Sequence, residues 1–321
     1  MSKPILAVAA GAFDSDRLIE HFGGEAELRF GPIGTADQVA HLTDGADALV
    51  VTLQPVREAL IGSLASSVKV IGRAGVGLDT IDLEAARTAG LSVINQPTYG
   101  TNEVASHGVA MLLALQRRLL AYDRYVRQGW QGSSRVGTIE PLDEMVVGII
   151  GCGHIGSAVA VMLRGLVGAV VAHDPLAGAF PDGVESCVSL DELLARSDAV
   201  SLHVPLNQET KGLLDRDRLQ AVRPGALLVN VSRGGLIDEP ALAEALHRGQ
   251  IGGAALDVFE TEPLPADSPL LDAPNTLFSP HSAAYSARSS WRLASWTIED
   301  TLAWITTRDV KHGNLVIKGD R

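Results

Sequence analysis

Short apolar runs rich in β-branched residues recur along the chain and alternate with amphipathic stretches. Near the N-terminus the runs cover residues 4–9, 48–52, 68–72 and 91–94, and helical patterns cover 13–21 and a segment that begins near Asp82. Strands that alternate with helices are typical of a parallel α/β sheet. The pattern therefore predicts a small parallel α/β unit in this part of the chain.

A second series of apolar runs begins at residue 146. It covers residues 146–150, 169–172, 199–203, 226–230, 253–257 and 276–278, and helical stretches at 190–196 and 240–248 lie between some of these runs. About six strands are expected of a dinucleotide-binding sheet. The predicted fold class is therefore α/β, with a Rossmann-type doubly wound parallel domain and a smaller flavodoxin-like α/β domain.

Two helices are predicted outside these series. The first starts at Thr101 or Asn102, either of which is a good N-cap, and it is apolar nearly all round as far as Leu115. Such a helix is buried on several sides, between two domains or in a subunit interface. The second, Ala287–Thr307, is amphipathic and carries three of the four tryptophans.

A glycine motif follows the apolar run 146–150. Gly151, Gly153 and Gly156 form the pattern G-x-G-x-x-G, and residues 157–163 have a helical pattern. In a strand–turn–helix context the first glycine permits a tight turn, the second lets the backbone approach a pyrophosphate, and the third lets helix and strand pack closely. The helix N-terminus attracts the phosphates. The N-terminal unit has no such motif, so we predict that a dinucleotide binds to the second series.

Asp174 follows the next apolar run, 18 residues after Gly156. A carboxylate at this place accepts hydrogen bonds from the adenosine ribose hydroxyls and repels a 2′-phosphate. The alternative is an aspartate that only caps the turn before Pro175. Together with the glycine motif, Asp174 favours NAD over NADP.

Three ionisable residues of complementary type follow later strands: Arg233, Glu262 and His281. Arginine offers a bidentate fork for a carboxylate, and imidazole is a natural proton donor to the alkoxide that forms when a ketone is reduced. A nearby carboxylate orients the ring and favours its protonated form. Taken singly, these residues could be a surface arginine, a solvated loop acid and a packed histidine. Their combination on a dinucleotide fold favours a catalytic group.

Composition narrows the classes of function. The net charge of −12 over 321 residues argues against binding to nucleic acid or to an anionic membrane. Two cysteines indicate no disulfide framework, and no two cysteines or histidines have metal-ligand spacing. No signal peptide and no apolar run long enough to span a membrane are found, so we expect a cytoplasmic protein without a bound metal.

With these residues in place, the chain resembles the D-isomer-specific 2-hydroxyacid dehydrogenases, a phosphoglycerate dehydrogenase-like family, across nearly its whole length. The matching stretches are residues 72–79, 151–156, 203–210, 223–235, 255–263 and 279–281. Residues 53–56 and 281–286 most resemble the branch that contains the C-terminal-binding proteins. That branch has a tryptophan where Ala284 stands here.

The resemblance implies a role for each matching residue. Arg233 clamps the substrate carboxylate and carbonyl, His281 is the acid/base, and Glu262 is its partner. Substrate contacts are implied for Arg73 and for the backbone amides of Val76 and Gly77. The remaining residues implied to bind NAD, with Asp257 near the nicotinamide carboxamide, are His154, Ile155, His203, Val204, Pro205, Thr210, Val231, Ser232 and Asp257.

The resemblance also implies a domain arrangement and an activity. The substrate domain comprises residues 1–98 and 286–321, the NAD-binding domain comprises residues 99–285, and no added regulatory domain is expected. Homodimers form through the helix at 103–120. The activity is NAD-dependent interconversion of a small 2-oxo acid and a D-2-hydroxy acid, and formate dehydrogenases of the superfamily lack the Arg–Glu–His combination. The alternative is an NAD(H)-sensing dimer that binds protein partners, as the C-terminal-binding proteins do.

Overall fold

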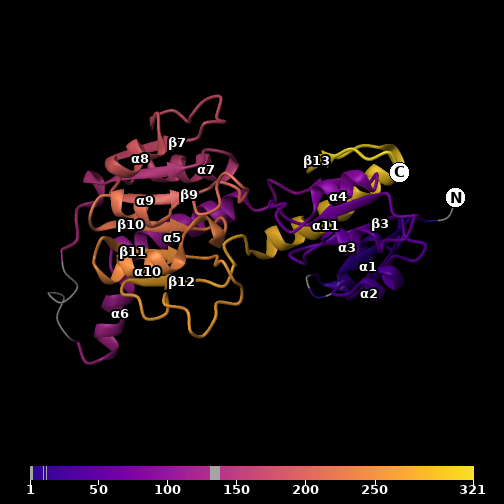
Figure 1. Ribbon diagram of the computed structural model, residues 1–321, viewed down its shortest axis with the longest axis horizontal. Helices are drawn as coiled ribbons and strands as arrows, with labels where there is room; N and C mark the ends of the chain where they lie inside the picture. Colours follow the sequence, from indigo (N-terminus) through magenta and orange to yellow (C-terminus); the bar gives the residue numbers. More distant parts are fainter. Residues whose placement is uncertain (1–2, 10, 12, 131–137) are drawn as a thin grey trace. The chain divides into compact units, whose positions relative to one another are not determined.

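The computed structural model describes residues 3–9, 11, 13–130 and 138–321. The chain divides into two compact units (Figure 1). Unit 1 contains the residues up to Gly100 together with Ser286–Arg321, and unit 2 contains Thr101–Tyr285. Each unit has its own sheet, so the predicted α/β fold with two sheets is confirmed.

The sheet of unit 1 has five parallel strands and one antiparallel edge strand in its described part. In chain order the parallel strands are arranged 2-1-3-4-5, the order known from flavodoxin. The central strands are buried on both faces, as parallel strands covered by helices require. The strands, in spatial order, are β13 (Asn314–Ile317), β5 (Ser92–Asn95), β4 (Val70–Arg73), β3 (Ala48–Val51), β1 (Ile5–Ala9) and β2 (Glu27–Gly31).

Five helices are described in unit 1: α1 (Ser15–Phe22), α2 (Ala36–Thr43), α3 (Glu58–Ile61), α4 (Leu83–Thr88) and α11 (Ala287–Thr307). The long helix α11 packs against β3 and β4. A Cβ atom on Gly72 of β4 would collide with the Thr301 hydroxyl, so the close approach of α11 requires a glycine there. Trp304 and Ile298 complete the apolar core under this helix, which explains why the chain returns to unit 1.

The sheet of unit 2 has seven parallel strands in its described part. In chain order they run 3-2-1-4-5-6-7, so the winding reverses between β6 and β9, where doubly wound sheets bind their ligands. About six strands were expected, and the short, exposed edge strand β8 is the addition. In spatial order the strands are β8 (Val184–Ser186), β7 (Ala169–His173), β6 (Val146–Ile150), β9 (Ala199–Leu202), β10 (Ala226–Asn230), β11 (Ile251–Leu256) and β12 (Thr276–Phe278).

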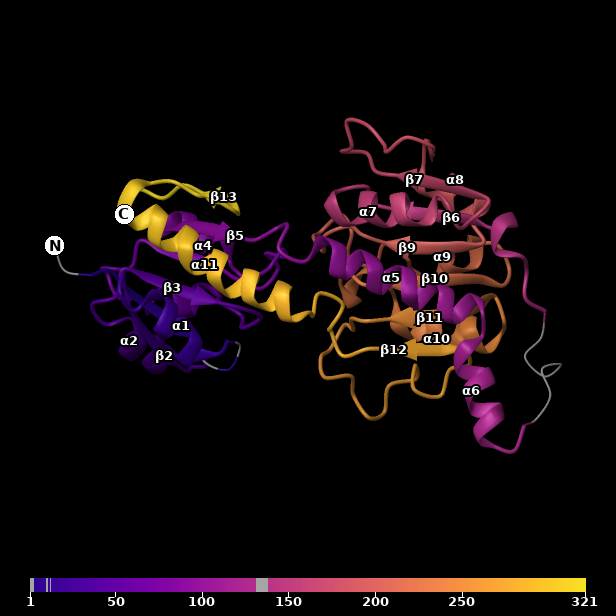
Figure 2. The same cartoon turned by 180° about the vertical axis from the view of Figure 1, so that it is seen from behind.

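Helices cover both faces of this sheet (Figure 2). On one face α5 (Thr101–Gln116) packs against α7 (His154–Leu163) and β10. The other core contains residues of α8 (Leu190–Arg196), α9 (Arg216–Ala221) and α10 (Glu239–His247). Short 3₁₀ turns occupy Leu142–Glu144 and Gly234–Leu236. No described helix has the length and apolarity needed to cross a membrane.

Two helix predictions need correction. Helix α7 begins at His154 rather than at residue 157, because Gly153 is the N-cap and the first helical turn lies inside the glycine motif. The helix predicted at 103–120 is two helices, since Arg118, with φ +54°, separates α5 from α6 (Leu119–Arg127). Helix α5 buries eight residues, whereas α6 has no buried residue.

Candidate active site

The predicted cofactor and catalytic residues of unit 2 lie at one edge of its sheet. Neighbouring strands are parallel and in register; Asn230 pairs with Leu256, which in turn pairs with Phe278. The carboxyl ends of the strands therefore meet at the same edge. The residues that follow these ends directly or within three positions are Gly151, Asp174, His203, Arg233, Asp257 and His281.

The three motif glycines meet different surroundings. Gly151 has φ +87°, and a Cβ there would lie 2.8 Å from the His203 carbonyl. A Cβ on Gly156 would collide with the carbonyl oxygen of Gly151. A Cβ on Gly153 would meet no atom within 4 Å. Gly151 and Gly156 are thus needed for packing, while open space at Gly153 fits the approach of a pyrophosphate to the N-terminus of α7.

Asp174 ties the glycine loop to the end of β7. Its Oδ2 accepts a hydrogen bond from the Cys152 N–H at 2.8 Å, and its Oδ1 accepts one from the Leu176 N–H at 2.9 Å. A carboxylate has about four acceptor positions. Asp174 therefore stabilises the turn and still has positions for two ribose hydroxyls, so the two interpretations of this residue are compatible.

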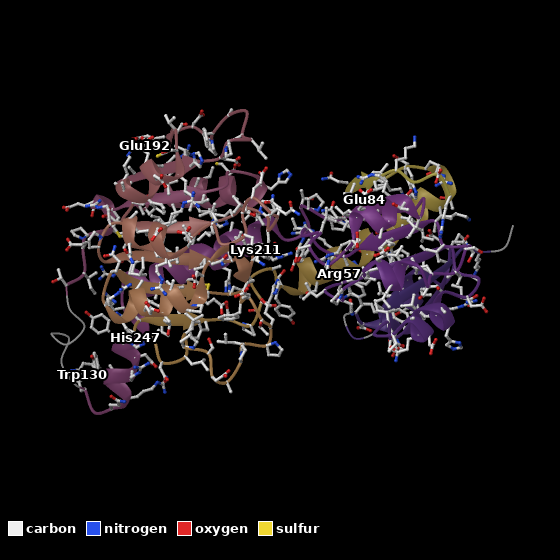
Figure 3. All side chains as sticks on the ribbon, in the orientation of Figure 1. Arg57, Glu84, Trp130, Glu192, Lys211 and His247 are labelled. Carbon is white, nitrogen blue, oxygen red and sulfur yellow. The ribbon has the colours of Figure 1, made fainter. Side chains whose placement is uncertain are left out.

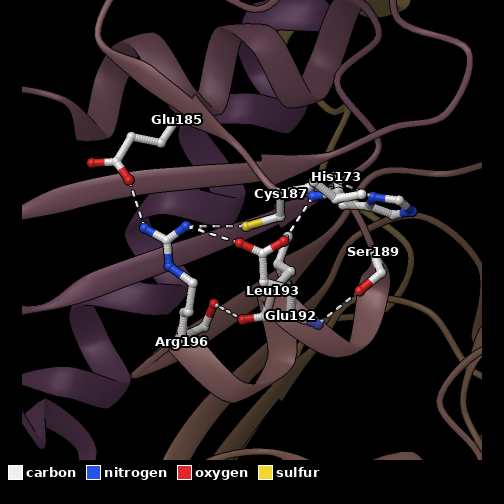
Figure 4. A network of polar contacts seen from close by, with 9 residues as sticks. His173, Glu185, Cys187, Ser189, Glu192, Leu193 and Arg196 are labelled. Carbon is white, nitrogen blue, oxygen red and sulfur yellow. Dashed lines mark hydrogen bonds and ion pairs between the residues drawn. The ribbon is translucent and has the colours of Figure 1, made fainter.

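A polar network fixes the loop that follows β8 (Figure 4). Arg196 pairs with Glu185 at 2.5 Å and with Glu192 at 3.3 Å, and Glu192 accepts the Val188 N–H at 2.8 Å. This arrangement leaves the Val188 side chain 90% exposed, and Leu176 on the neighbouring loop is 92% exposed. Because Ala172 and Ser186 pair in register, both loops leave the sheet side by side and present apolar surface next to Asp174.

The loop after β9 holds a neutral histidine. His203 Nε2 lies 2.8 Å from Ser201 Oγ, and burial lowers the pKa of His203 to about 3. Its Nδ1 is buried and has no hydrogen-bond partner among the described residues. Farther along, Thr210 Oγ1 donates to the Pro205 carbonyl at 2.6 Å, which fixes the backbone that carries the predicted cofactor contacts.

Burial also shifts the pKa of both cysteines. It raises the pKa of the Cys152 thiol and of the Cys187 thiol, so both stay protonated near neutral pH. Cys152 packs in the core beside the glycine loop. Neither thiol has the environment of a nucleophile.

Arg233 and Glu262 come from adjacent loops that touch through their backbones. Arg233 Nη1 donates to the Ser232 carbonyl at 2.7 Å, and Asn230 Nδ2 donates to the Arg233 carbonyl at 2.8 Å. A Cβ on Gly234 would collide with the Phe259 carbonyl carbon. Only glycine permits this approach, so Gly234 brings the arginine loop onto the loop that carries Glu262.

His281 pairs with Glu262. His281 Nδ1 lies 2.7 Å from Glu262 Oε2, and Glu262 Oε1 accepts the Phe259 N–H at 3.0 Å. Both side chains are about one-third exposed, with values of 29% and 33%. His281 has φ +51°, a region that residues other than glycine rarely adopt and that recurs at functional sites.

The sequence did not single out two further groups near this pair. His107 Nε2, on α5, lies 2.9 Å from Ser279 Oγ, and Ser279 in turn contacts Asp257. Glu239 accepts the Glu260 N–H at 2.6 Å, and burial raises the pKa of Glu239. The helix predicted at 240–248 begins at Glu239 in the structure, so the prediction left Glu239 outside the helix.

The predicted substrate residues of unit 1 are Arg73, the last residue of β4, and Val76 and Gly77 on the loop that follows. Arg73 is only 2% exposed, and its Nη1 donates to the Ala74 carbonyl under Gly75, so it supports the loop from within. Asn95 Nδ2 donates to the Val76 carbonyl at 2.7 Å. These contacts fix the backbone of Val76 and Gly77, whose amides were predicted to bind the substrate.

The sequence pattern of one protein family matches this chain at residues 109–283, more than half of its length. That family is "D-isomer specific 2-hydroxyacid dehydrogenase, NAD binding domain". The chain belongs to the D-isomer-specific 2-hydroxyacid dehydrogenases. Its resemblance to the C-terminal-binding-protein branch stays a prediction.

The named relatives of this chain are enzymes. It is 38% identical over 296 residues to D-3-phosphoglycerate dehydrogenase of Mycobacterium tuberculosis, covering 91% of this chain and 55% of that protein. It is 37% identical over 266 residues to glyoxylate reductase of Korarchaeum cryptofilum, covering 80% and 79%. The chain thus spans about half the length of the mycobacterial relative.

A solved structure shows the same fold. The NADPH-dependent glyoxylate/hydroxypyruvate reductase SmGhrB of Sinorhizobium meliloti superposes with a TM-score of 0.86 at 28% identity, covering 100% of this chain and 99% of that one. The superposition covers both units, so the family's two-domain fold is present.

Proposed function

We propose that the protein is an NAD-dependent oxidoreductase that interconverts a small 2-oxo acid and a D-2-hydroxy acid. The observation that carries the proposal is the 2.7 Å contact between His281 Nδ1 and Glu262 Oε2. The loop that carries Glu262 lies directly against the loop that carries Arg233. An imidazole, a carboxylate and a guanidinium at the carboxyl edge of a dinucleotide-binding sheet suit this chemistry. Relatives named as phosphoglycerate dehydrogenase and glyoxylate reductase support the assignment.

The proton chemistry follows from the geometry of His281. A carboxylate only accepts hydrogen bonds, so Nδ1 carries the proton that bonds to Glu262 and Nε2 exchanges a proton with the substrate oxygen. Arg233 binds the substrate carboxylate and polarises the carbonyl. A bound NADH would supply the hydride for the reduction at C2, and His281 Nε2 would donate its proton to the substrate oxygen; oxidation would reverse both transfers.

NAD fits the residues present. Open space at Gly153, spare acceptor positions on Asp174 and the buried Nδ1 of His203 suit a dinucleotide. Val188 and Leu176 offer an apolar surface for the adenine. Because Asp174 is anionic where a 2′-phosphate would lie, we propose a preference for NAD over NADP, although the solved relative is named as NADPH-dependent.

We propose that NAD binds to unit 2 and that residues of both units take part in substrate recognition. Unit 2 carries NAD and the residues Arg233, Glu262 and His281. Unit 1 contributes the Val76 and Gly77 amides to substrate recognition, with Arg73 as the internal support of their loop.

We also propose a homodimer that uses α6. This helix has no buried residue and leaves Leu119 54% and Val126 52% exposed. Trp130, labelled in Figure 3 just beyond α6, is 79% exposed. Large apolar side chains grouped on one segment are typical of an interface. The helix implied for this role, at 103–120, comprises most of α5, which buries eight of its 16 residues, and the start of α6.

A panel of 2-oxo acids tests the activity, with NADH or NADPH oxidation followed by absorbance. We expect turnover of at least one small 2-oxo acid with NADH, and we expect His281→Ala to abolish it while NADH still binds. If NADH binds but no acid in a broad panel is reduced, the enzyme proposal is wrong. That result would favour the NAD(H)-sensing, protein-binding alternative.

A further inference from the structure

A second polar cluster lies behind the catalytic pair in unit 2. His107 Nε2, on α5, is 2.9 Å from Ser279 Oγ, and Ser279 Oγ is 2.5 Å from Asp257 Oδ1. His107 Nε2 is also 3.8 Å from the same carboxylate oxygen. The Asp257 side chain is 1% exposed and the His107 side chain is 31% exposed, so the cluster runs from a partly exposed ring on α5 to a buried carboxylate on the loop after β11.

The direction of these hydrogen bonds follows from the groups involved. The Asp257 carboxylate accepts hydrogen bonds only, so Ser279 must donate its single hydroxyl proton to it. Ser279 then accepts from His107, which fixes the proton on His107 at Nε2. The chain of hydrogen bonds therefore runs from the donor His107 through Ser279 to the acceptor Asp257.

Asp257 in turn holds the segment that carries His281. Its backbone carbonyl accepts the His281 N–H at 2.7 Å, Oδ1 accepts the Ser282 N–H at 2.9 Å, and Oδ2 accepts the Ala283 N–H at 2.9 Å. The segment 281–283 thus wraps around one buried aspartate. His281 has φ +51° there, which is unfavourable for a residue other than glycine. Such a conformation persists only where several surrounding contacts hold it in place.

We propose that His107 is a positioning residue for His281, acting through Ser279 and Asp257. The Nε2–H of His107 fixes the Ser279 hydroxyl, which keeps Asp257 in the orientation that receives the Ser282 and Ala283 amides. The segment then presents the His281 ring to Glu262. This role rests on the proposed function, because it concerns the placement of the proposed acid/base.

Conservative and disruptive variants separate positioning from simple packing. His107→Ala removes the donor, whereas His107→Gln keeps an N–H at about the place of Nε2. Ser279→Ala breaks the next link. His247→Ala changes an exposed histidine on α10, labelled in Figure 3, and serves as the matched control.

We expect His107→Ala and Ser279→Ala to lower kcat for 2-oxo acid reduction about tenfold or more, because small misplacement of a reacting group is costly. KM for NADH should stay within about twofold, since neither variant changes the glycine loop or Asp174, which are proposed to bind the pyrophosphate and the ribose. His107→Gln should recover most of the lost kcat, and His247→Ala should match the wild type. Equal kcat in His107→Ala and the wild type would overturn the proposal, as would a loss that His107→Gln does not recover.

Amide hydrogen exchange of the segment 281–283 tests the same link without turnover. Exchange at Ser282 and Ala283 should speed up in His107→Ala and return toward the wild-type rate in His107→Gln, at unchanged Tm. If the wild type reduces no 2-oxo acid but these exchange rates change as expected, the proposed function fails while the structural relay stands. Unchanged exchange in His107→Ala would contradict the relay whatever the enzyme turns over.

Discussion

Glu262 bonds His281 Nδ1 through one carboxylate oxygen and the Phe259 N–H through the other, at 2.7 and 3.0 Å. The carboxylate therefore has a fixed orientation before any substrate binds. A general acid works well only when its ring is held in one tautomer and one direction. The Phe259 N–H, on the same loop as Glu262, therefore preorganises the His281–Glu262 pair.

Glu262→Gln tests the charge of this pair. The amide oxygen can still accept the Nδ1–H, but the amide nitrogen then faces the Phe259 N–H, and the negative charge beside the His281 ring is lost. We expect kcat for reduction to fall about 10- to 100-fold. Steady-state kinetics of 2-oxo acid reduction with NADH measures this loss. Glu260→Gln, which removes a charge from the same loop, is the control, and equal kcat in the two variants would contradict the role of Glu262.

Asp174→Asn tests cofactor preference. The amide oxygen can still accept from the Cys152 N–H, which keeps the anchor of the glycine loop, while the bond from the Leu176 N–H is lost and the charge that repels a 2′-phosphate is removed. We expect the ratio of kcat/KM for NADH over NADPH to fall about tenfold or more. Asp182→Asn, on an exposed turn, controls for the loss of one charge. A ratio unchanged from the wild type would show that Asp174 does not select the cofactor.

The residues found from sequence alone share one property: they follow a buried strand. Gly151, Asp174 and Arg233 come at such ends, and a parallel sheet gathers all of its carboxyl ends at one edge. Strand periodicity therefore predicted which side chains share an edge. It did not give the distance between Glu262 and His281, which depends on the course of two loops.

Two kinds of feature could not be predicted from the sequence. The first depends on packing between distant segments, and the second consists of elements that are only partly buried. His107 and Ser279 are 172 positions apart and meet only because α5 packs near β12. The edge strands β2, β8 and β13 have mixed exposure, so no continuous apolar run marks them. The start of α7 was misplaced because glycine-rich residues gave no helical pattern.

Gly234→Ala should separate the two catalytic loops. The new Cβ would collide with the backbone of Phe259 and Glu260, which cannot move aside as a flexible side chain would. We expect a loss of about 1–3 kcal/mol in the free energy of unfolding and a fall in kcat of about 100-fold, because the Arg233 and Glu262 loops part. Denaturant unfolding and steady-state kinetics measure both. Gly165→Ala, whose Cβ meets nothing within 4 Å, should change neither.

Gly153→Ala should leave stability unchanged and weaken NADH binding. A Cβ here meets no protein atom within 4 Å, so stability should stay within about 0.5 kcal/mol of the wild type. The methyl group instead enters the space in which the backbone approaches a pyrophosphate. We expect Kd for NADH to rise about tenfold or more, measured by fluorescence titration. Unchanged NADH affinity would mean that the dinucleotide does not use this loop.

His203 should make the fold sensitive to acid. Its pKa falls from 6.5 to about 3 in the folded chain because burial disfavours the charged ring. The unfolded state then binds a proton that the folded state does not, so this contribution to stability is complete above about pH 6.5 and is lost as the pH falls toward 3. Without cofactor, the free energy of unfolding of His203→Gln should fall less steeply below pH 6.5, by up to about 1.4 kcal/mol per pH unit. Urea unfolding across this range measures the slopes, with His247→Gln as the control for the loss of one histidine. If the slopes of His203→Gln and the wild type coincide, His203 takes up its proton as readily in the folded chain as in the unfolded one.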